Sequence, residues 1–71
     1  ARRVAIIGAG DVGANLAREL LSRRGMGMRP VVFFDDDRSK WHSQVHGVPV
    51  VGEPELLKHP RPEWRIEEVI I

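Results

Sequence analysis

The 71-residue sequence contains no cysteine, no tyrosine and no long apolar run. Without cysteine, neither a disulfide nor a thiolate metal site can stabilise so small a chain. No apolar segment approaches the roughly 20 residues that a helix needs to cross a bilayer, and no signal-peptide pattern opens the sequence. We therefore expect a small soluble module, compatible with the cytoplasm, that makes no membrane contact of its own.

A strong charge of either sign is also missing. Eleven Lys and Arg residues stand against ten Asp and Glu residues, for a net charge of +1, and the basic residues are scattered among the acidic ones. A nucleic-acid-binding domain carries a basic face or stripe instead. His42 and His46 have the four-residue spacing of helical zinc ligands, but the acidic residue of the metalloprotease pattern is missing between them. We expect neither nucleic acid nor a metal ion as a ligand.

The sequence does contain a glycine turn between a strand pattern and a helix pattern. Residues 4–7 are apolar, and Gly8, Gly10 and Gly13 follow with the spacing G-x-G-x-x-G of dinucleotide-binding loops. In such loops the first glycine permits the turn, the second lets a pyrophosphate approach, and the third lets the helix pack closely. The helix N-terminus adds N–H groups and a positive dipole end. The predicted nucleotide contacts are Gly8, Ala9, Gly10, Asp11, Val12 and Gly13. A glycine turn retained only for packing is the alternative.

An amphipathic helix is predicted after the loop. Val12, Leu16 and Leu20 recur at steps of four and are expected to face the sheet, with Gly13, Ala17 and Leu21 beside them. Gly25 is the expected end of the helix, and residues 25–29 are expected to form a loop.

A second strand is predicted at Val31–Phe34, an unbroken apolar run typical of a parallel strand covered on both faces. It ends in three aspartates. In dinucleotide sites a carboxylate at this position accepts hydrogen bonds from the adenosine ribose hydroxyls. Asp35 is closest to the strand and is the first candidate, with Asp36 second. A carboxylate here repels a ribose 2′-phosphate, which favours NAD(H) over NADP(H).

Two questions stay open at this acidic turn. Arg38 and Lys40 lie close in sequence and keep NADP(H) as an alternative cofactor. Asp36 or Asp37 could also serve as the N-cap of the next helical segment.

The rest of the chain predicts a strand at 47–52, one or two helical turns at 53–58 and a last strand at 67–71. Pro49 is expected to confine its strand to an edge or a bulge. Right-handed crossovers would then give the strand order 3-2-1-4. This is an α/β fold, the Rossmann-like half of a doubly wound parallel sheet.

Residues 1–71 are thus expected to form one NAD(P)-binding Rossmann-like domain. We also expect this domain to be a fragment of a longer protein, because the last apolar strand has no turn or polar tail after it.

Four segments together resemble a known family: Val4–Gly13, Phe33–Asp37, His46–Gly52 and Glu67–Ile71. The pattern is similar to the N-terminal Rossmann-like (CoA-binding-like) domain of the membrane-associated nucleoside-diphosphate-sugar epimerase/4,6-dehydratases of polysaccharide biosynthesis (CapD type). The resemblance implies membrane helices before this domain, a separate catalytic short-chain dehydrogenase domain after it, and a parent protein at the cytoplasmic face of the inner membrane.

The resemblance also implies that this segment binds a nucleotide without catalysing a reaction. The catalytic Tyr/Lys pair of the family belongs to the later domain, and this chain has no tyrosine, so no catalytic residue is predicted here. By position, Gly8, Gly10, Gly13 and Asp35 would contact the nucleotide, with NAD as the expected cofactor. The match departs from the family at residues 38–41, where a proline is common.

Two other classes of function remain open. The chain could be the cofactor-sensing domain of an NADH-responsive redox regulator, which would need a DNA-binding winged helix upstream. It could instead be an oligomerisation module with a vestigial loop, because an exposed edge strand is a template for pairing with a second copy. The expected partners are a nucleotide cofactor, the remaining domains of the parent chain and a second copy of the chain.

Overall fold

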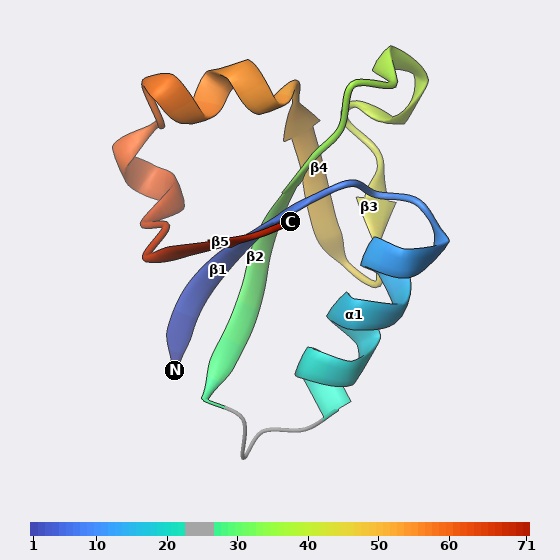
Figure 1. Cartoon of the computed structure of the whole chain (residues 1–71), viewed down its shortest axis with the longest axis vertical. Helices are drawn as coiled ribbons and strands as arrows, with labels where there is room; N and C mark the ends of the chain where they lie inside the picture. Colours follow the sequence, from blue (N-terminus) through green and yellow to red (C-terminus); the bar gives the residue numbers. More distant parts are fainter. Residues whose placement is uncertain (23–26) are drawn as a thin grey trace.

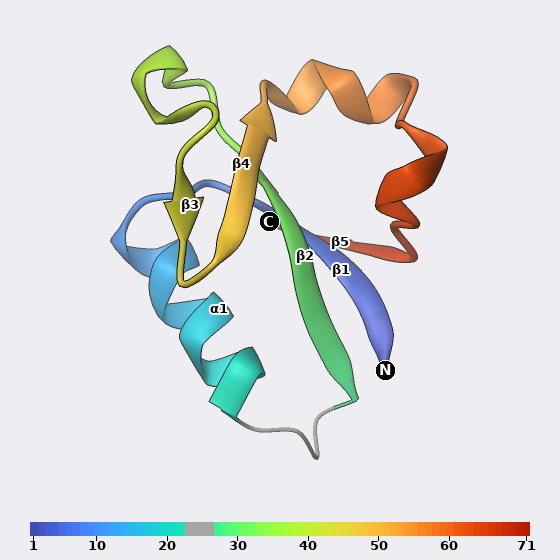
Figure 2. The same ribbon diagram turned by 180° about the vertical axis from the view of Figure 1, so that it is seen from behind.

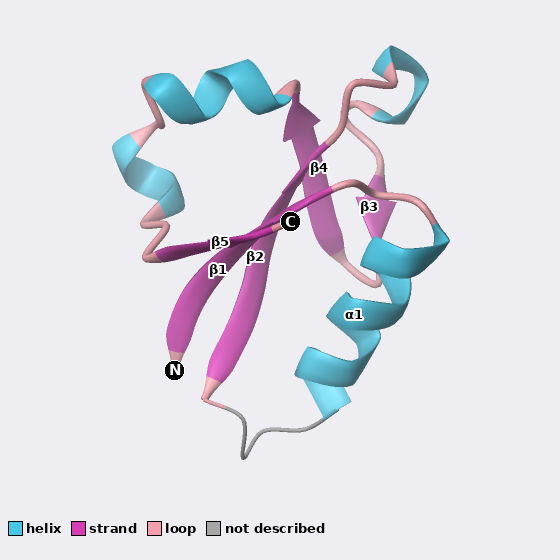
Figure 3. Ribbon diagram, in the orientation of Figure 1, coloured by secondary structure: helices cyan, strands magenta, loops and turns pink. Residues whose placement is uncertain are grey.

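The computed structural model describes residues 1–22 and 27–71. Its strands and one α-helix are β1 (Arg2–Ile7), α1 (Asp11–Ser22), β2 (Met28–Phe34), β3 (Gln44–Val45), β4 (Val48–Gly52) and β5 (Glu68–Ile70) (Figure 1). Three short 3₁₀ helices complete the described elements, namely η2 (Arg38–Lys40), η3 (Pro54–Lys58) and η4 (Pro62–Trp64) (Figure 3).

The strands form one sheet in the order β3-β4-β2-β1-β5. β1 pairs in parallel with both β2 and β5, and β2 pairs in parallel with β4. These four strands follow the predicted order 3-2-1-4, and the predicted α/β Rossmann-like class is confirmed. The full order differs in one detail, because the two-residue β3 adds an antiparallel strand outside β4 that the sequence patterns did not predict.

The apolar core has two layers, one on each face of the sheet. On one face, α1 packs over a cluster that includes Ile6 and Phe33, with Ala17 of the helix buried against it. On the other face, Ala5 and Phe34 pack with residues of the segment that carries η3 and η4 between β4 and β5, which we call the η3–η4 connection; Trp64 is one of these residues. Figures 1 and 2 show α1 and the η3–η4 connection on opposite sides of the strands. Alternate residues of β1 and β2 therefore serve opposite layers, as expected of parallel strands.

The buried face of α1 is the predicted one except at Val12 and Leu21, which are exposed. Gly13, Ala17 and Leu20 are its buried residues, whereas Val12 is 85% exposed. The predicted stripe holds at Leu20, which is buried, and at Leu16, which packs against the core, but Val12 in the first turn lies outside the packed face. The predicted helix end at Gly25 lies outside the described residues.

The two strand prolines also correct the predictions. β2 begins at Met28, so Arg29 belongs to a strand and not to a loop, and Pro30 lies inside that strand. A register shift between Val4 and Ala5 of β1 accommodates it, since Pro30 and Val32 are successive partners. Pro49 was expected at an edge or a bulge, but β4 has β2 on one side and β3 on the other.

No helix among the described residues is long and apolar enough to span a membrane.

Candidate nucleotide-binding site

The glycine loop leaves the sheet beside the end of β2. Gly8 adopts a positive φ of 101°, and its N–H donates to the carbonyl oxygen of Phe34 at 2.7 Å. The helix begins at Asp11, and the Ala14 N–H donates to the Gly10 carbonyl oxygen at 2.8 Å. The first N–H groups of α1 have no partner within the helix. These groups and the positive end of the helix dipole lie at the helix N-terminus, directly after the glycine loop.

The second and third glycines of the loop have different surroundings. A Cβ atom at Gly13 would overlap the carbonyl oxygen of Gly8, so only glycine lets α1 pack this closely. A Cβ atom at Gly10 would meet a single neighbour within 4 Å, the Nζ atom of Lys40 at 3.8 Å. The fold therefore needs a glycine at position 13 for its own packing, whereas the space above Gly10 is open.

The carboxylate of Asp35 ties the glycine loop to the end of β2. Its Oδ2 atom accepts the Ala9 N–H at 2.7 Å, and its Oδ1 atom accepts the Asp37 N–H at 2.8 Å. The Asp35 side chain is 15% exposed, and Lys40 Nζ lies 3.8 Å from Oδ2. These contacts, the Ala9 N–H first and the Asp37 N–H second, lower the pKa of Asp35 below its ordinary value. Because a carboxylate has about four lone-pair sites, Asp35 keeps acceptor capacity for a ligand hydroxyl.

The turn after Asp35 is held by its own polar contacts. The Oδ1 atom of Asp37 accepts the backbone N–H of Ser39 at 3.0 Å and its hydroxyl at 2.6 Å, which makes Asp37 the N-cap of η2. The Trp41 indole Nε1–H donates to the Asp35 carbonyl oxygen at 2.7 Å. Of the two N-cap candidates, Asp37 is therefore the one used. Asp36 is exposed and makes no hydrogen bond or ion pair with any described residue.

A shallow pocket of about 250 Å³ lies beside the glycine loop, at the carboxyl ends of the strands. Its lining is largely apolar and includes Val12, Leu16 and Ile71 together with Gly8 and Gly10 of the loop. Here β1 lies between β2 and β5, which is where the strand order reverses. Ligands of doubly wound sheets bind at this kind of topological switch point.

The structure thus brings together most of the residues singled out in the sequence. The loop residues and Asp35 share one edge of the sheet, whereas Asp36 points to no partner there. The sequence patterns did not place Lys40 beside the glycine loop. The available signal was a basic residue five positions after Asp35. No group of three or more metal-ligating side chains occurs among residues 1–22 and 27–71.

Comparison with known proteins places this chain in a family. A family model described as a CoA-binding domain matches residues 1–71, so the chain belongs to that family of domains. Among curated proteins, it is 38% identical over 69 residues to the probable polysaccharide biosynthesis protein EpsC of Bacillus subtilis (strain 168), covering 97% of this chain. It is also 38% identical over 71 residues to the capsular polysaccharide biosynthesis protein CapD of Staphylococcus aureus, covering 93% of this chain.

Among solved structures, the UDP-D-quinovosamine 4-dehydrogenase from Vibrio fischeri superposes with a TM-score of 0.77 at 34% identity, over 96% of this chain and 53% of that one. These matches confirm the resemblance to the CapD-type proteins of polysaccharide biosynthesis. The chain spans 12% and 11% of the length of the two curated relatives, and about half of the solved structure.

Proposed function

We propose that this chain is the non-catalytic, dinucleotide-binding domain of a nucleoside-diphosphate-sugar epimerase or dehydratase of polysaccharide biosynthesis, with NAD as its ligand. The observation that carries the proposal is the contact between the Asp35 carboxylate and the Ala9 N–H at 2.7 Å. It joins the glycine loop and the acidic strand end, the two halves of a dinucleotide site, at one edge of the sheet.

Each part of the site suits one part of the ligand. The first N–H groups of α1 and its dipole would hold the diphosphate above Gly10, where no backbone or core atom would obstruct it. The remaining lone pairs of Asp35 would accept a ribose hydroxyl, and Val12 and Ile71 offer apolar walls. NAD would supply hydride-transfer chemistry when bound. This chain has no tyrosine, so it cannot supply the Tyr of the catalytic Tyr/Lys pair that the family resemblance implies, which supports binding without catalysis.

The parent protein would supply the sugar chemistry. The described helices include none that could cross a membrane, and the relatives are much longer than this chain. We therefore assign catalysis and membrane attachment to other domains, with this domain on the cytoplasmic side. Pairing of two copies through the sheet edge remains part of the proposal, because only the two-residue β3 covers that side of β4.

Coenzyme A is a second candidate ligand, favoured by the description of the matching family. It shares the ADP portion of NAD but carries an additional phosphate on the adenosine ribose. A ribose carboxylate partner such as Asp35 opposes that phosphate by charge repulsion, which is why NAD ranks first.

Titration calorimetry and amide NMR would test the proposal, using NAD, ADP-ribose, coenzyme A and a UDP-sugar as probes. We expect saturable binding of NAD and ADP-ribose, with amide shifts in residues 8–13 and at Asp35. The Gly10→Val variant should keep its circular dichroism spectrum and lose binding, because its side chain enters the open space. Tighter binding of coenzyme A than of NAD would reassign the ligand. Silence towards all four probes would contradict the proposal and favour a loop retained for packing.

A further inference from the structure

We propose that Lys40 is a phosphate-binding residue of this site, which exchanges its contact with Asp35 for the diphosphate of the incoming nucleotide. This inference rests on the proposed nucleotide-binding function. It adds a cationic side chain, from the turn after β2, to the phosphate contacts of the glycine loop. It also means that Lys40 leaves Asp35 when the nucleotide binds.

The position of the Lys40 ammonium group carries the inference. Its Nζ atom lies 3.8 Å from Asp35 Oδ2, and apart from the residues next to Gly10 in the chain it is the one described atom within 4 Å of the place where a Gly10 side chain would begin. The ammonium group is therefore close both to the carboxylate proposed to bind the ribose and to the glycine that gives a diphosphate room to approach. A diphosphate bound above Gly10 would meet this cation.

The backbone of Lys40 is held in place, while its side chain remains partly free. The Lys40 N–H donates to the Asp37 carbonyl oxygen at 3.0 Å, and the Ser43 N–H donates to the Lys40 carbonyl oxygen at 3.2 Å. Next to it, Trp41 is anchored through its indole to Asp35. The Lys40 side chain is 38% exposed, so its charge can move without unfolding the turn.

The charges favour an exchange of partners. At 3.8 Å the ammonium group is beyond hydrogen-bond distance of the Asp35 carboxylate, and that carboxylate already accepts two backbone N–H groups. A diphosphate has more negative charge and offers several oxygens without such donors, so it attracts Lys40 more strongly. Lys40 does not hydrogen-bond to Oδ2, so that oxygen keeps a lone pair for a ribose hydroxyl while Lys40 turns to the diphosphate.

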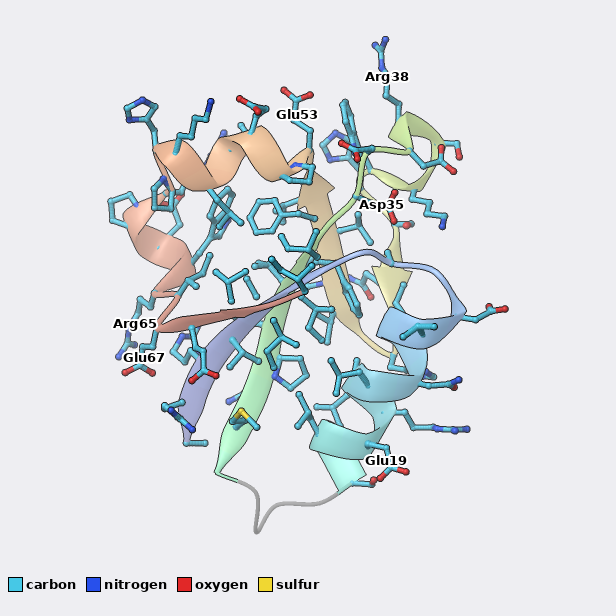
Figure 4. The ribbon with its side chains drawn as sticks, viewed as in Figure 1. Glu19, Asp35, Arg38, Glu53, Arg65 and Glu67 are labelled. Carbon is cyan, nitrogen blue, oxygen red and sulfur yellow. The ribbon has the colours of Figure 1, made fainter. Side chains whose placement is uncertain are left out.

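Arg38 provides a matched control on the same turn. Its guanidinium group lies over the ring of Trp41, 5.7 Å from the centroid. Figure 4 shows Arg38 directed away from the loop into solvent, whereas Asp35 lies between η2 and the loop. Arg38→Gln removes the same charge as Lys40→Gln at a point that does not face the glycine loop.

The test measures the Kd of ADP-ribose and of adenosine for the wild-type protein and for the Lys40→Gln, Lys40→Arg and Arg38→Gln variants. Lys40→Gln should weaken ADP-ribose binding about ten- to hundredfold, the effect of losing one charge-assisted hydrogen bond. The Kd of adenosine, which has no phosphate, should change less than about twofold in the same variant. Lys40→Arg should retain most of the affinity, and Arg38→Gln should resemble the wild type.

The salt dependence of ADP-ribose binding gives a second readout. It should be shallower in Lys40→Gln than in the wild type, because one ionic contact is gone. Equal ADP-ribose affinity in Lys40→Gln and wild type, or an equal loss in Arg38→Gln, would overturn the role of Lys40 and leave the proposed function standing. A wild-type protein that binds neither ADP-ribose nor NAD would overturn the proposed function itself.

Discussion

Gly10 and Gly13 belong to one motif, yet the structure assigns them different physical tasks. Gly13 faces the backbone of Gly8 inside the fold, whereas Gly10 faces open space that contains only the end of the Lys40 side chain within 4 Å. Gly13 is therefore required for packing, whereas Gly10 borders open space in front of the loop.

Alanine substitutions should separate these tasks. Gly13→Ala must push α1 away from the Gly8 carbonyl and should cost about 1–3 kcal/mol of unfolding free energy, the usual range for overpacking. Gly10→Ala should change the stability by less than about 0.5 kcal/mol, as is usual for a surface position. Urea denaturation followed by circular dichroism would compare the two variants. Equal stabilities would contradict the packing role of Gly13.

The Asp35 carboxylate gives the site a predictable response to acid. Its pKa is lowered by the N–H groups of Ala9 and Asp37, which favour the ionised form. A carboxyl group with a lower pKa in the folded state stabilises the fold above its unfolded pKa, and this contribution disappears as the pH falls through the folded pKa. The unfolding free energy should therefore decrease as the pH falls below about 4.

Asp35→Asn should reduce this acid sensitivity. Asparagine has one acceptor oxygen, so it can replace only one of the two oxygens that accept the Ala9 and Asp37 N–H groups. The variant should lose about 1–2 kcal/mol of unfolding free energy near pH 7, and its unfolding free energy should depend less on pH below pH 4. Asp37 will keep some dependence, because its contacts with Ser39 lower its pKa as well. If the stability of the variant depended on pH as that of the wild type does, ionisation of Asp35 would make no contribution to the stability of the fold. Thermal unfolding at a series of pH values is the measurement.

At the scale of elements, the β3–β4 hairpin depends on two residues with positive φ. His46 has a φ of 51° and Gly47 a φ of 81°, and they connect the paired residues Val45 and Val48. Positive φ at both central residues is typical of a type I′ turn, whose twist matches that of the strands. This two-residue turn returns the chain along β4 and creates the short edge strand.

Gly47→Ala should destabilise this hairpin by about 1–2 kcal/mol, the cost of a left-handed conformation in a residue with a Cβ atom. His46→Asn is the matched control, because asparagine tolerates positive φ and should leave the stability unchanged or slightly higher. Hydrogen exchange of the Val50 N–H, which donates to the Ser43 carbonyl oxygen at 2.9 Å, would report on the hairpin directly. Faster exchange in His46→Asn than in Gly47→Ala would contradict this account.

At the scale of the whole molecule, two central phenylalanines stabilise opposite faces of one sheet. Phe33 is fully buried under α1, and Phe34 is fully buried on the other face, where its ring meets Trp64 edge to face at 5.3 Å. A domain of this size has a stability of only about 4–11 kcal/mol, at about 0.05–0.15 kcal/mol per residue. Neither layer is therefore dispensable.

Phe33→Ala and Phe34→Ala should each cost about 3–5 kcal/mol, enough to remove much of the stability of the domain. Val12→Ala, at an exposed position of α1, should stay within about 0.5 kcal/mol of the wild type. The comparison needs only denaturant unfolding of the three variants. A mild effect of one phenylalanine alone would mean that its layer contributes little to the cooperative fold.

Much of this molecule is determined by local sequence patterns. The apolar runs of β1 and β2, the glycine spacing and the acidic strand end predict a parallel α/β unit with a nucleotide loop. Each of these signals lies within a few residues and reflects backbone sterics or burial on both faces. The order of the four parallel strands follows from the same patterns, because crossover handedness leaves few arrangements.

Other features were decided only by tertiary structure. Periodicity predicts most of the buried face of α1, but not the exposure of Val12 or the close approach of Gly13 to Gly8. Pro30 could enter β2 because a register shift against β1 accommodates it. The contact of Lys40 with Asp35, and its place beside Gly10, depend on the path of the capped turn between them. Sequence determined the elements and their pattern, whereas contacts between residues distant along the chain determined which side chains meet at the site.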